Sequence, residues 1–221
     1  MRLPDPALLV VTDRKQASSA LADIVAAALA AGCRWISLRE KDLPETEQIA
    51  ILAAMRPLTR QWGACLTLHG AAALARTADA DGVHLPSGSD APAARAALGA
   101  DALIGISIHS VAEAERLDAA VVDYAVAGPA FATPSKPGYG PVLGLRGLAA
   151  IARASSVPII AIGGIEVDAV GEVLDAGAGG VAVMGSVMRA ARPGDTVASL
   201  VAALEASHTR SKRQQPDHRP R

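Results

Sequence analysis

The chain has 221 residues, 51% of them hydrophobic and only 2% aromatic, with 21 Lys and Arg against 22 Asp and Glu. The apolar fraction is too high for a disordered chain, yet no stretch reaches the roughly 18 uninterrupted apolar residues of a membrane helix. One Phe, two Tyr and two Trp argue against an aromatic stacking platform for nucleic acid. We therefore expect no membrane and no nucleic acid among its partners.

Short strand-like runs alternate with helical segments along the chain. The eight expected strands are Leu8–Thr12, Trp35–Arg39, Ala64–His69, Gly82–Leu85, Ala102–Ser107, Tyr124–Ala127, Pro158–Ile162 and Gly180–Met184. The helices expected after them are Ser19–Ala31, Glu45–Arg60, Ala72–Thr77, Pro92–Leu98, Val111–Leu117, Leu145–Arg153, Val167–Asp175 and Asp195–Glu205. Such alternation predicts a parallel sheet, and eight units in about 205 residues fit an α/β protein with a single (β/α)8 TIM barrel. A doubly wound open sheet is the alternative.

The body and the C-terminal end of the chain differ in charge. Residues 1–207 are expected to form the barrel, and residues 208–221 are expected to be a disordered basic tail. The body is mildly acidic and is not suited to polyanions. We expect a cytoplasmic protein, because the N-terminus lacks a signal-peptide pattern and the two cysteines are isolated. The sequence is compatible with a homodimer.

Glycines follow the seventh and eighth expected strands. In a parallel barrel, catalytic groups lie at the C-terminal strand ends and in the loops after them. Gly163 and Gly164 in one loop, with Met184 and Gly185 in the other, are typical of a phosphate cradle, because glycine lets backbone N–H groups approach phosphate oxygens closely. The alternative for the glycine pair is a tight turn without a ligand.

Cations and hydroxyls follow the second and sixth strands. Arg39 and Lys41, on either side of Glu40, suit a phosphate or diphosphate, or else they form a salt-bridged rim. The irregular loop after the sixth strand is long enough to suggest a binding loop or lid. Its candidate ligand-binding side chains are Thr133, Ser135 and Lys136.

Polar residues also end the third, fourth and fifth strands. Ser107 points toward the barrel mouth if its two neighbours face outward. Ser110 is predicted to cap the next helix, with Glu113 completing a capping box. His69 and His84 sit at strand ends, where a lone histidine is more often structural than catalytic.

Spacing typical of a metal site is absent from the sequence. Asp90 is a candidate ligand for a Mg²⁺ ion held together with substrate phosphates. Nothing in its spacing compels that role.

Several segments, in this order and spacing, carry a family resemblance: LVVTD, LREKD, DGVHLPSGSD, IGISIHS, DYAVAGPAFATPSKPG, VPIIAIGGI and AGAGGVAV. They resemble the thiamine phosphate synthase family, including its TenI-type thiazole tautomerase branch, from about Leu8 to Glu205. The resemblance implies a TIM barrel that binds thiazole phosphate and joins it to hydroxymethylpyrimidine diphosphate in thiamine biosynthesis. It also implies release of diphosphate, with Mg²⁺ assisting the departure.

The resemblance assigns roles to matching residues. Arg39 and Lys41 match diphosphate-binding cations, and Ser107 matches a serine near the pyrimidine. The loop residues Thr133, Ser135 and Lys136 match a Thr-x-Thr-Lys motif. Residues matching positions whose backbone N–H groups hold the thiazole phosphate are Gly164, Met184 and Gly185.

The chain departs from both branches of the family. His69, Gly70 and Ala71 stand where the synthase has an Asn-Asp-Arg triplet with a metal-binding Asp, and Ser37 replaces a glutamine. Pro129 stands where some tautomerases have their acid–base histidine.

Three hypotheses follow. The chain is a divergent thiamine phosphate synthase, a thiazole phosphate tautomerase, or a non-catalytic relative that binds these phosphates. In the tautomerase hypothesis, His69 would be the proton shuttle, a role that suits an imidazole near pH 7.

Overall fold

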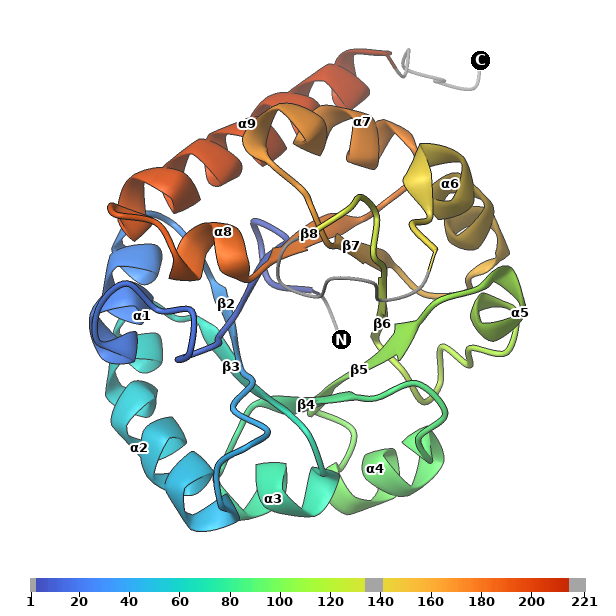
Figure 1. Cartoon of the computed structure of the whole chain (residues 1–221). Helices are drawn as coiled ribbons and strands as arrows, with labels where there is room; N and C mark the ends of the chain where they lie inside the picture. Colours follow the sequence, from blue (N-terminus) through green and yellow to red (C-terminus); the bar gives the residue numbers. More distant parts are fainter. Residues whose placement is uncertain (1–2, 134–140, 215–221) are drawn as a thin grey trace, which may run out of the picture.

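Eight parallel strands pair in chain order and close into a barrel (Figure 1). The structure is a computed structural model that describes residues 3–133 and 141–214. The strands are β1 Leu8–Val11, β2 Trp35–Leu38, β3 Cys65–His69, β4 Gly82–Leu85, β5 Leu103–Ile108, β6 Tyr124–Ala127, β7 Ile159–Ile162 and β8 Gly180–Val183. Leu8 of β1 pairs with Val181 of β8 and closes the ring. The predicted (β/α)8 barrel is confirmed, and each predicted strand is correct to within one residue at either end.

The helices form a ring outside the strands (Figure 1). They are α1 Leu21–Ala30, α2 Glu45–Gln61, α3 Ala72–Thr77, α4 Ala91–Leu98, α5 Val111–Ala114, α6 Gly144–Ala154, α7 Val170–Asp175 after a short 3-10 turn at Val167–Ala169, α8 Gly185–Met188 and α9 Pro193–Gln214. Their apolar faces pack on the strands, as Ile24, Val25, Ala28 and Leu29 of α1 do. None of the helices in the described ranges is long and apolar enough to cross a membrane.

Three helices differ from the sequence prediction. The one-turn helix α8 was not predicted, and α5 ends at Ala114 rather than Leu117. Helix α9 runs to Gln214, so residues 208–214 belong to the last helix and not to the predicted disordered tail. Arg, Lys and Gln are good helix formers, which is why the basic segment continues the helix. Residues 215–221 lie outside the described residues.

Two apolar layers form the core, because successive strand residues point to opposite faces. The outer layer lies between the strands and the helices, and the inner layer fills the barrel. The inner cluster contains Leu9, Val11, Trp35, Leu103, Tyr124, Val126, Ile160 and Ala182. Leu3 packs against this inner cluster from the N-terminal segment. The interior of the barrel is therefore a packed core and not an open channel.

Candidate functional site

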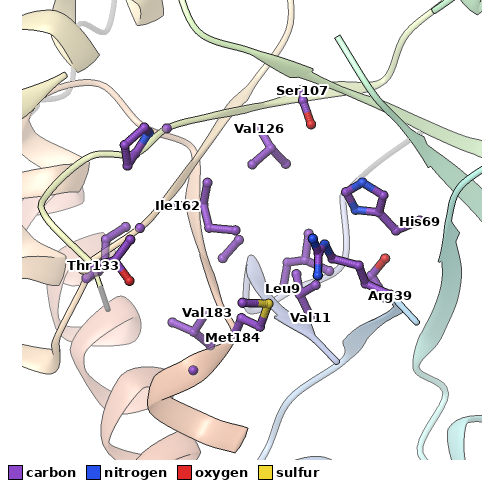
Figure 2. A pocket seen from close by; sticks show the side chains of 18 of the residues that line it. Leu9, Val11, Arg39, His69, Ser107, Val126, Thr133, Ile162, Val183 and Met184 are labelled. Carbon is purple, nitrogen blue, oxygen red and sulfur yellow. The ribbon is translucent and has the colours of Figure 1, made fainter. Parts of the chain in front are cut away.

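A cavity of about 550 Å³ opens at the C-terminal ends of the strands, and all eight strands contribute to its walls. This is where (β/α)8 enzymes place their ligands. Figure 2 shows Arg39 and His69 on one side of the cavity and Thr133 across from them. The predicted site residues that line it are Arg39, Lys41, His69, Ser107, Thr133, Gly163, Gly164, Met184 and Gly185. Ser135 and Lys136 lie outside the described residues.

The floor of the cavity is polar on one side. Ser107 faces the cavity while its neighbours Ile106 and Ile108 pack in the outer core, as the strand alternation predicts. The Ser37 hydroxyl is buried and lines the same cavity. Within the described residues this hydroxyl has no hydrogen-bond partner. A buried, unpaired hydroxyl costs free energy, and a polar ligand atom in the cavity would relieve that cost.

Among the described residues, the cations that line the cavity are Arg39, Lys41 and Arg189. Arg39 forms no ion pair with any carboxylate in the described part of the chain, so its charge is available to an anion. Arg189 was missed in the sequence because it directly follows α8, the helix that was not predicted. Its guanidinium bonds the Gln16 side chain, which also bonds Asp13 at 2.5 Å. The two loops after β1 and β8 are thereby tied together at the rim.

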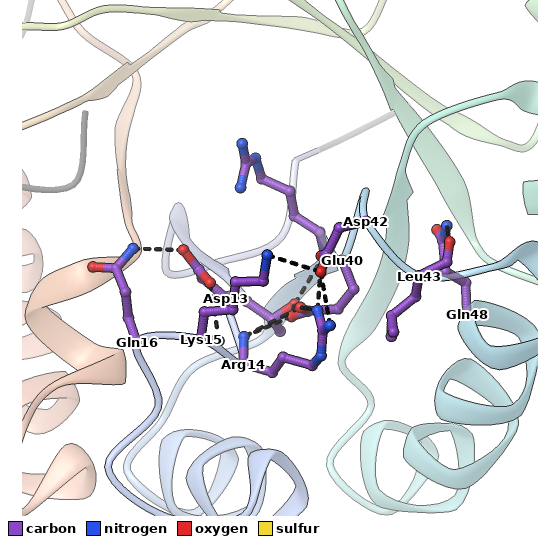
Figure 3. A network of polar contacts seen from close by, with 10 residues as sticks. Asp13, Arg14, Lys15, Gln16, Glu40, Asp42, Leu43 and Gln48 are labelled. Atoms are coloured by element: carbon purple, nitrogen blue, oxygen red, sulfur yellow. Dashed lines mark hydrogen bonds and ion pairs between the residues drawn. The ribbon is translucent and has the colours of Figure 1, made fainter. Parts of the chain in front are cut away.

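Glu40 orients the loop that carries Arg39 through contacts with Thr12 and Arg14 (Figure 3). The buried carboxylate accepts hydrogen bonds from the Thr12 hydroxyl at 2.8 Å and from the Arg14 backbone N–H at 3.0 Å. Thr12 Oγ1 in turn accepts the backbone N–H of Arg39 at 2.9 Å. Glu40 therefore joins the ends of β1 and β2 and fixes the backbone from which Arg39 reaches the cavity.

Arg14 completes this network from the solvent side. Its guanidinium lies 3.2 Å from Glu40 and makes two 2.7 Å hydrogen bonds to Asp42. These contacts hold the pKa of the Asp42 carboxyl well below its usual range, chiefly through the Arg14 hydrogen bonds and then through Lys15. A salt-bridged rim thus exists at this end of the barrel, and Arg14 and Lys15 take part in it through Asp42.

The glycines after β7 are required by packing as well as by any ligand. Gly163 and Gly164 have positive φ angles of 101° and 63°. A Cβ at Gly164 would lie 2.4 Å from the Ala132 carbonyl oxygen, and one at Gly163 would lie 2.9 Å from Pro129. The pair therefore forms a tight turn, whether or not the loop binds a ligand. Phosphate binding by the loop stays a prediction, supported by its position at the cavity.

Ser110 caps α5 as predicted, but the carboxylate of Glu113 accepts the backbone N–H of His109 and not, as in a capping box, that of Ser110. The Glu113 N–H donates to Ser110 Oγ at 3.3 Å, and the Glu113 carboxylate accepts the His109 N–H at 2.7 Å. The same carboxylate accepts the Ser87 hydroxyl, and these hydrogen bonds lower the pKa of Glu113 against the opposing effect of burial. Ser87 and His109 both line the cavity, so Glu113 joins two of its loops.

Two histidines lie together at one side of the floor. The rings of His69 and His84 are 4.7 Å apart, and His84 Nε2 lies 2.9 Å from Ser107 Oγ. Burial, with the nearby charge of Lys41, lowers the pKa of His84 to about 3. The imidazole of His84 is therefore neutral at physiological pH.

The pKa of His84 predicts acid destabilisation. In the unfolded chain His84 has an ordinary pKa near 6.5 and is protonated below that pH, whereas in the folded chain it is protonated only near pH 3. The contribution of His84 to the free energy of unfolding is thus complete above pH 6.5 and is lost as pH falls toward 3, by up to about 1.4 kcal/mol per pH unit. Urea unfolding of wild type and His84→Gln between pH 7 and 4 measures this: the variant should show the shallower slope. Parallel slopes would contradict it.

The described residues do not fit a Mg²⁺ ion held by the protein. Glu166 is the single carboxylate that lines the cavity, and no cluster of three or more His, Cys, Asp or Glu side chains suited to a metal is found in residues 3–133 and 141–214. Asp90, the predicted ligand, is exposed and accepts the Ala93 N–H at 2.9 Å as the N-cap of α4.

Asp90 variants separate a role as metal ligand from its role as N-cap of α4. Asp90→Asn should retain activity to within about twofold, because Asn caps a helix as well as Asp, whereas Asp90→Ala should lower the free energy of unfolding by about 1 kcal/mol. Steady-state rates and urea unfolding of both variants measure this. A loss of activity greater than about tenfold in Asp90→Asn, in a chain as stable as wild type, would instead assign the carboxylate to a metal.

Comparison with known proteins agrees with this geometry. The family model described as thiamine monophosphate synthase matches residues 8–187. A thiamine-phosphate synthase of Roseiflexus sp. strain RS-1 is 41% identical over 198 residues, covering 88% of this chain and 84% of the relative. A thiamine-phosphate synthase of Streptomyces avermitilis is 40% identical, covering 87% and 90%. A solved thiamine phosphate pyrophosphorylase from Pyrococcus furiosus superposes with a TM-score of 0.80 at 32% identity, covering 90% of this chain and 96% of that one. The chain belongs to the thiamine monophosphate synthase family.

Proposed function

We propose that the chain is a thiamine-phosphate synthase, a transferase that joins thiazole phosphate to hydroxymethylpyrimidine diphosphate. Relatives that carry this name match most of the chain at about 40% identity. The observation that carries the proposal is one cavity lined both by Arg39, which forms no ion pair within the described residues, and by the glycines after β7 and β8. Its volume of about 550 Å³ suits ligands of small-molecule size.

The coupling needs a stabilised leaving group more than a strong base. The bond from the pyrimidine methylene carbon to the diphosphate oxygen breaks, and its electron pair leaves with the diphosphate. The thiazole nitrogen donates its lone pair to the same carbon and becomes quaternary, so this nitrogen neither gains nor loses a proton. Arg39 and Lys41 are the groups we assign to the growing negative charge, where prepositioned cations act most strongly.

The other end of the cavity suits the monophosphate. Gly164 lies in the loop after β7, Gly185 begins α8 after β8, and both line the cavity. Backbone N–H groups there can reach phosphate oxygens without a side chain in the way. Arg189 adds a cation at the rim. The substrates of this proposal are small phosphorylated molecules, and the expected cytoplasmic location belongs to the same proposal.

The test is a coupling assay with the purified full chain. Both substrates are supplied with and without Mg²⁺, each substrate alone serves as the control, and thiamine phosphate is measured by chromatography. Formation of thiamine phosphate only when both substrates are present is expected. Tight binding of thiazole phosphate without any product would overturn the synthase and favour a non-catalytic binding protein.

A second substrate tests the tautomerase hypothesis in the same preparation. His69 lines the cavity, and its ring lies 4.7 Å from that of His84 at a tilt of 56°. A proton-shuttling role for His69 remains a prediction. Conversion of thiazole carboxylate phosphate to its aromatic tautomer, lost in His69→Asn while coupling is absent, would replace the synthase by a tautomerase. Unchanged isomerisation in His69→Asn would remove His69 from that role.

A further inference from the structure

A hydrogen-bonded chain runs from the barrel interior to the cavity floor. Tyr124 Oη lies 3.3 Å from His84 Nδ1, and His84 Nε2 lies 2.9 Å from Ser107 Oγ. Tyr124 is fully buried, His84 is buried, and Ser107 faces the cavity. The chain therefore connects two buried groups to one hydroxyl that can touch a ligand.

Gly105 makes the room for this chain on the strand between its members. Gly105 of β5 pairs with His84 of β4 on one side and with Tyr124 of β6 on the other. A Cβ at Gly105 would lie 2.0 Å from Cζ of Tyr124, so the phenol ring crosses β5 where a side chain is missing. The ring also packs edge-on against Trp35, with centroids 4.6 Å apart, which restricts where the hydroxyl can point.

The partners of Tyr124 decide which way the hydrogen bonds run. Within the described residues, His84 Nδ1 is the one hydrogen-bond partner of the Tyr124 hydroxyl. If Nδ1–H donated to that oxygen, the hydroxyl proton would be buried without an acceptor, and such groups are rare and costly. Donation from Tyr124 to Nδ1 avoids the cost and places the imidazole proton on Nε2.

A neutral imidazole has one donor and one acceptor nitrogen. With Nδ1 as the acceptor, Nε2–H donates to Ser107 Oγ. One lone pair of that oxygen is then occupied, and the Ser107 proton is left to point toward the cavity.

We propose that Tyr124 and His84 are positioning residues that make Ser107 a hydrogen-bond donor to an acceptor atom of the bound substrate. Tyr124 sets the tautomer of His84, and His84 sets the direction of the Ser107 hydroxyl. The identity of the acceptor rests on the proposed function. If the chain is the synthase, the acceptor is a ring nitrogen of the pyrimidine. The tautomer itself is a property of the free protein.

The tautomer is measured without any substrate. In the full chain labelled with ¹⁵N-histidine, the His84 signals are assigned by their loss in His84→Gln. At pH 7 we expect a neutral ring with the proton on Nε2, a pattern that weakens in Tyr124→Phe. Trp35→Phe is the matched control, because it changes the packing against Tyr124 but not its hydroxyl, and should keep the Nε2–H form. A proton on Nδ1 in the wild type would overturn the proposal, whatever the outcome of the coupling assay.

A double-mutant cycle tests the effect on Ser107. Ser107→Ala and Tyr124→Phe should each lower kcat/KM by roughly tenfold, because each removes one hydrogen bond that stabilises the transition state. If Tyr124 acts through Ser107, adding Tyr124→Phe to Ser107→Ala lowers the rate no further, because residues in one network are not additive. Multiplicative losses in the double variant would show that Tyr124 acts by another route and would overturn the proposal.

Discussion

Arg39→Gln is expected to lower kcat/KM for coupling by about 100-fold or more while leaving the fold intact. The side chain lines the cavity and forms no ion pair with a carboxylate in the described ranges. Its loss should therefore remove an interaction with the bound ligand and no ion pair within the protein. Removing one prepositioned group that stabilises developing negative charge typically costs about 10²–10³ in rate. Steady-state kinetics with the pyrimidine diphosphate varied should show the loss.

The control for Arg39→Gln is Arg153→Gln, which removes an exposed arginine from α6 on the outside of the barrel. It should leave the kinetics unchanged. A rate within about threefold of wild type for Arg39→Gln would remove Arg39 from the diphosphate site.

Glu40→Ala is expected to cost more stability than any exposed substitution in the same network. The carboxylate is buried and accepts hydrogen bonds from Thr12 and from the Arg14 backbone. Removing it leaves these donors without their acceptor, and losses of about 3 kcal/mol are usual when one partner of a buried charged network is deleted. Urea unfolding at pH 7 measures the change in the free energy of unfolding.

Two variants make the Glu40 experiment specific. Glu40→Gln keeps an acceptor oxygen and should recover part of the stability. Asp42→Asn weakens only the exposed pairs to Arg14 and Lys15 and should cost far less, since exposed ion pairs contribute little. Equal losses in Glu40→Ala and Asp42→Asn would show that the buried carboxylate is not the centre of the network.

The fold could be predicted from the sequence because each strand of a parallel barrel is buried on both faces. Runs such as Leu8–Val11 are continuously apolar, and the intervening helices carry apolar residues on one side. The one-turn helix at Gly185–Met188 could not be predicted, because four residues are too few to show a helical period. The extension of the last helix to Gln214 was not predicted, because the basic charge of this segment indicates a tail, whereas the helix propensity of its Arg, Lys and Gln residues favours a helix.

The candidate site was predictable to the extent that it lies at strand ends. Arg39, His69 and Ser107 were found in this way, and each lines the cavity. Arg189 was not, because it follows the helix that the sequence did not reveal. The partners of Glu40 were not predictable either, because Thr12 and Arg14 reach it through the pairing of β1 with β2, strands that are distant in sequence.

The scarcity of aromatic residues gains a different meaning in the structure. Trp35 and Tyr124 pack edge to face inside the barrel, and the Tyr124 ring stacks on that of His84, which lines the cavity. Composition counts rings but does not place them. Two of the five, Trp35 and Tyr124, lie inside the barrel, where they pack beneath the polar floor of the site.

The most direct test of the central claim is the stoichiometry of coupling, followed by ³¹P NMR in one reaction mixture. Thiamine phosphate and free diphosphate should appear together in equal amounts as thiazole phosphate is consumed, and both should be almost absent with Arg39→Gln. Diphosphate released without thiamine phosphate, or no change in either substrate with a fully folded chain, would contradict the assignment of this cavity to the synthase reaction.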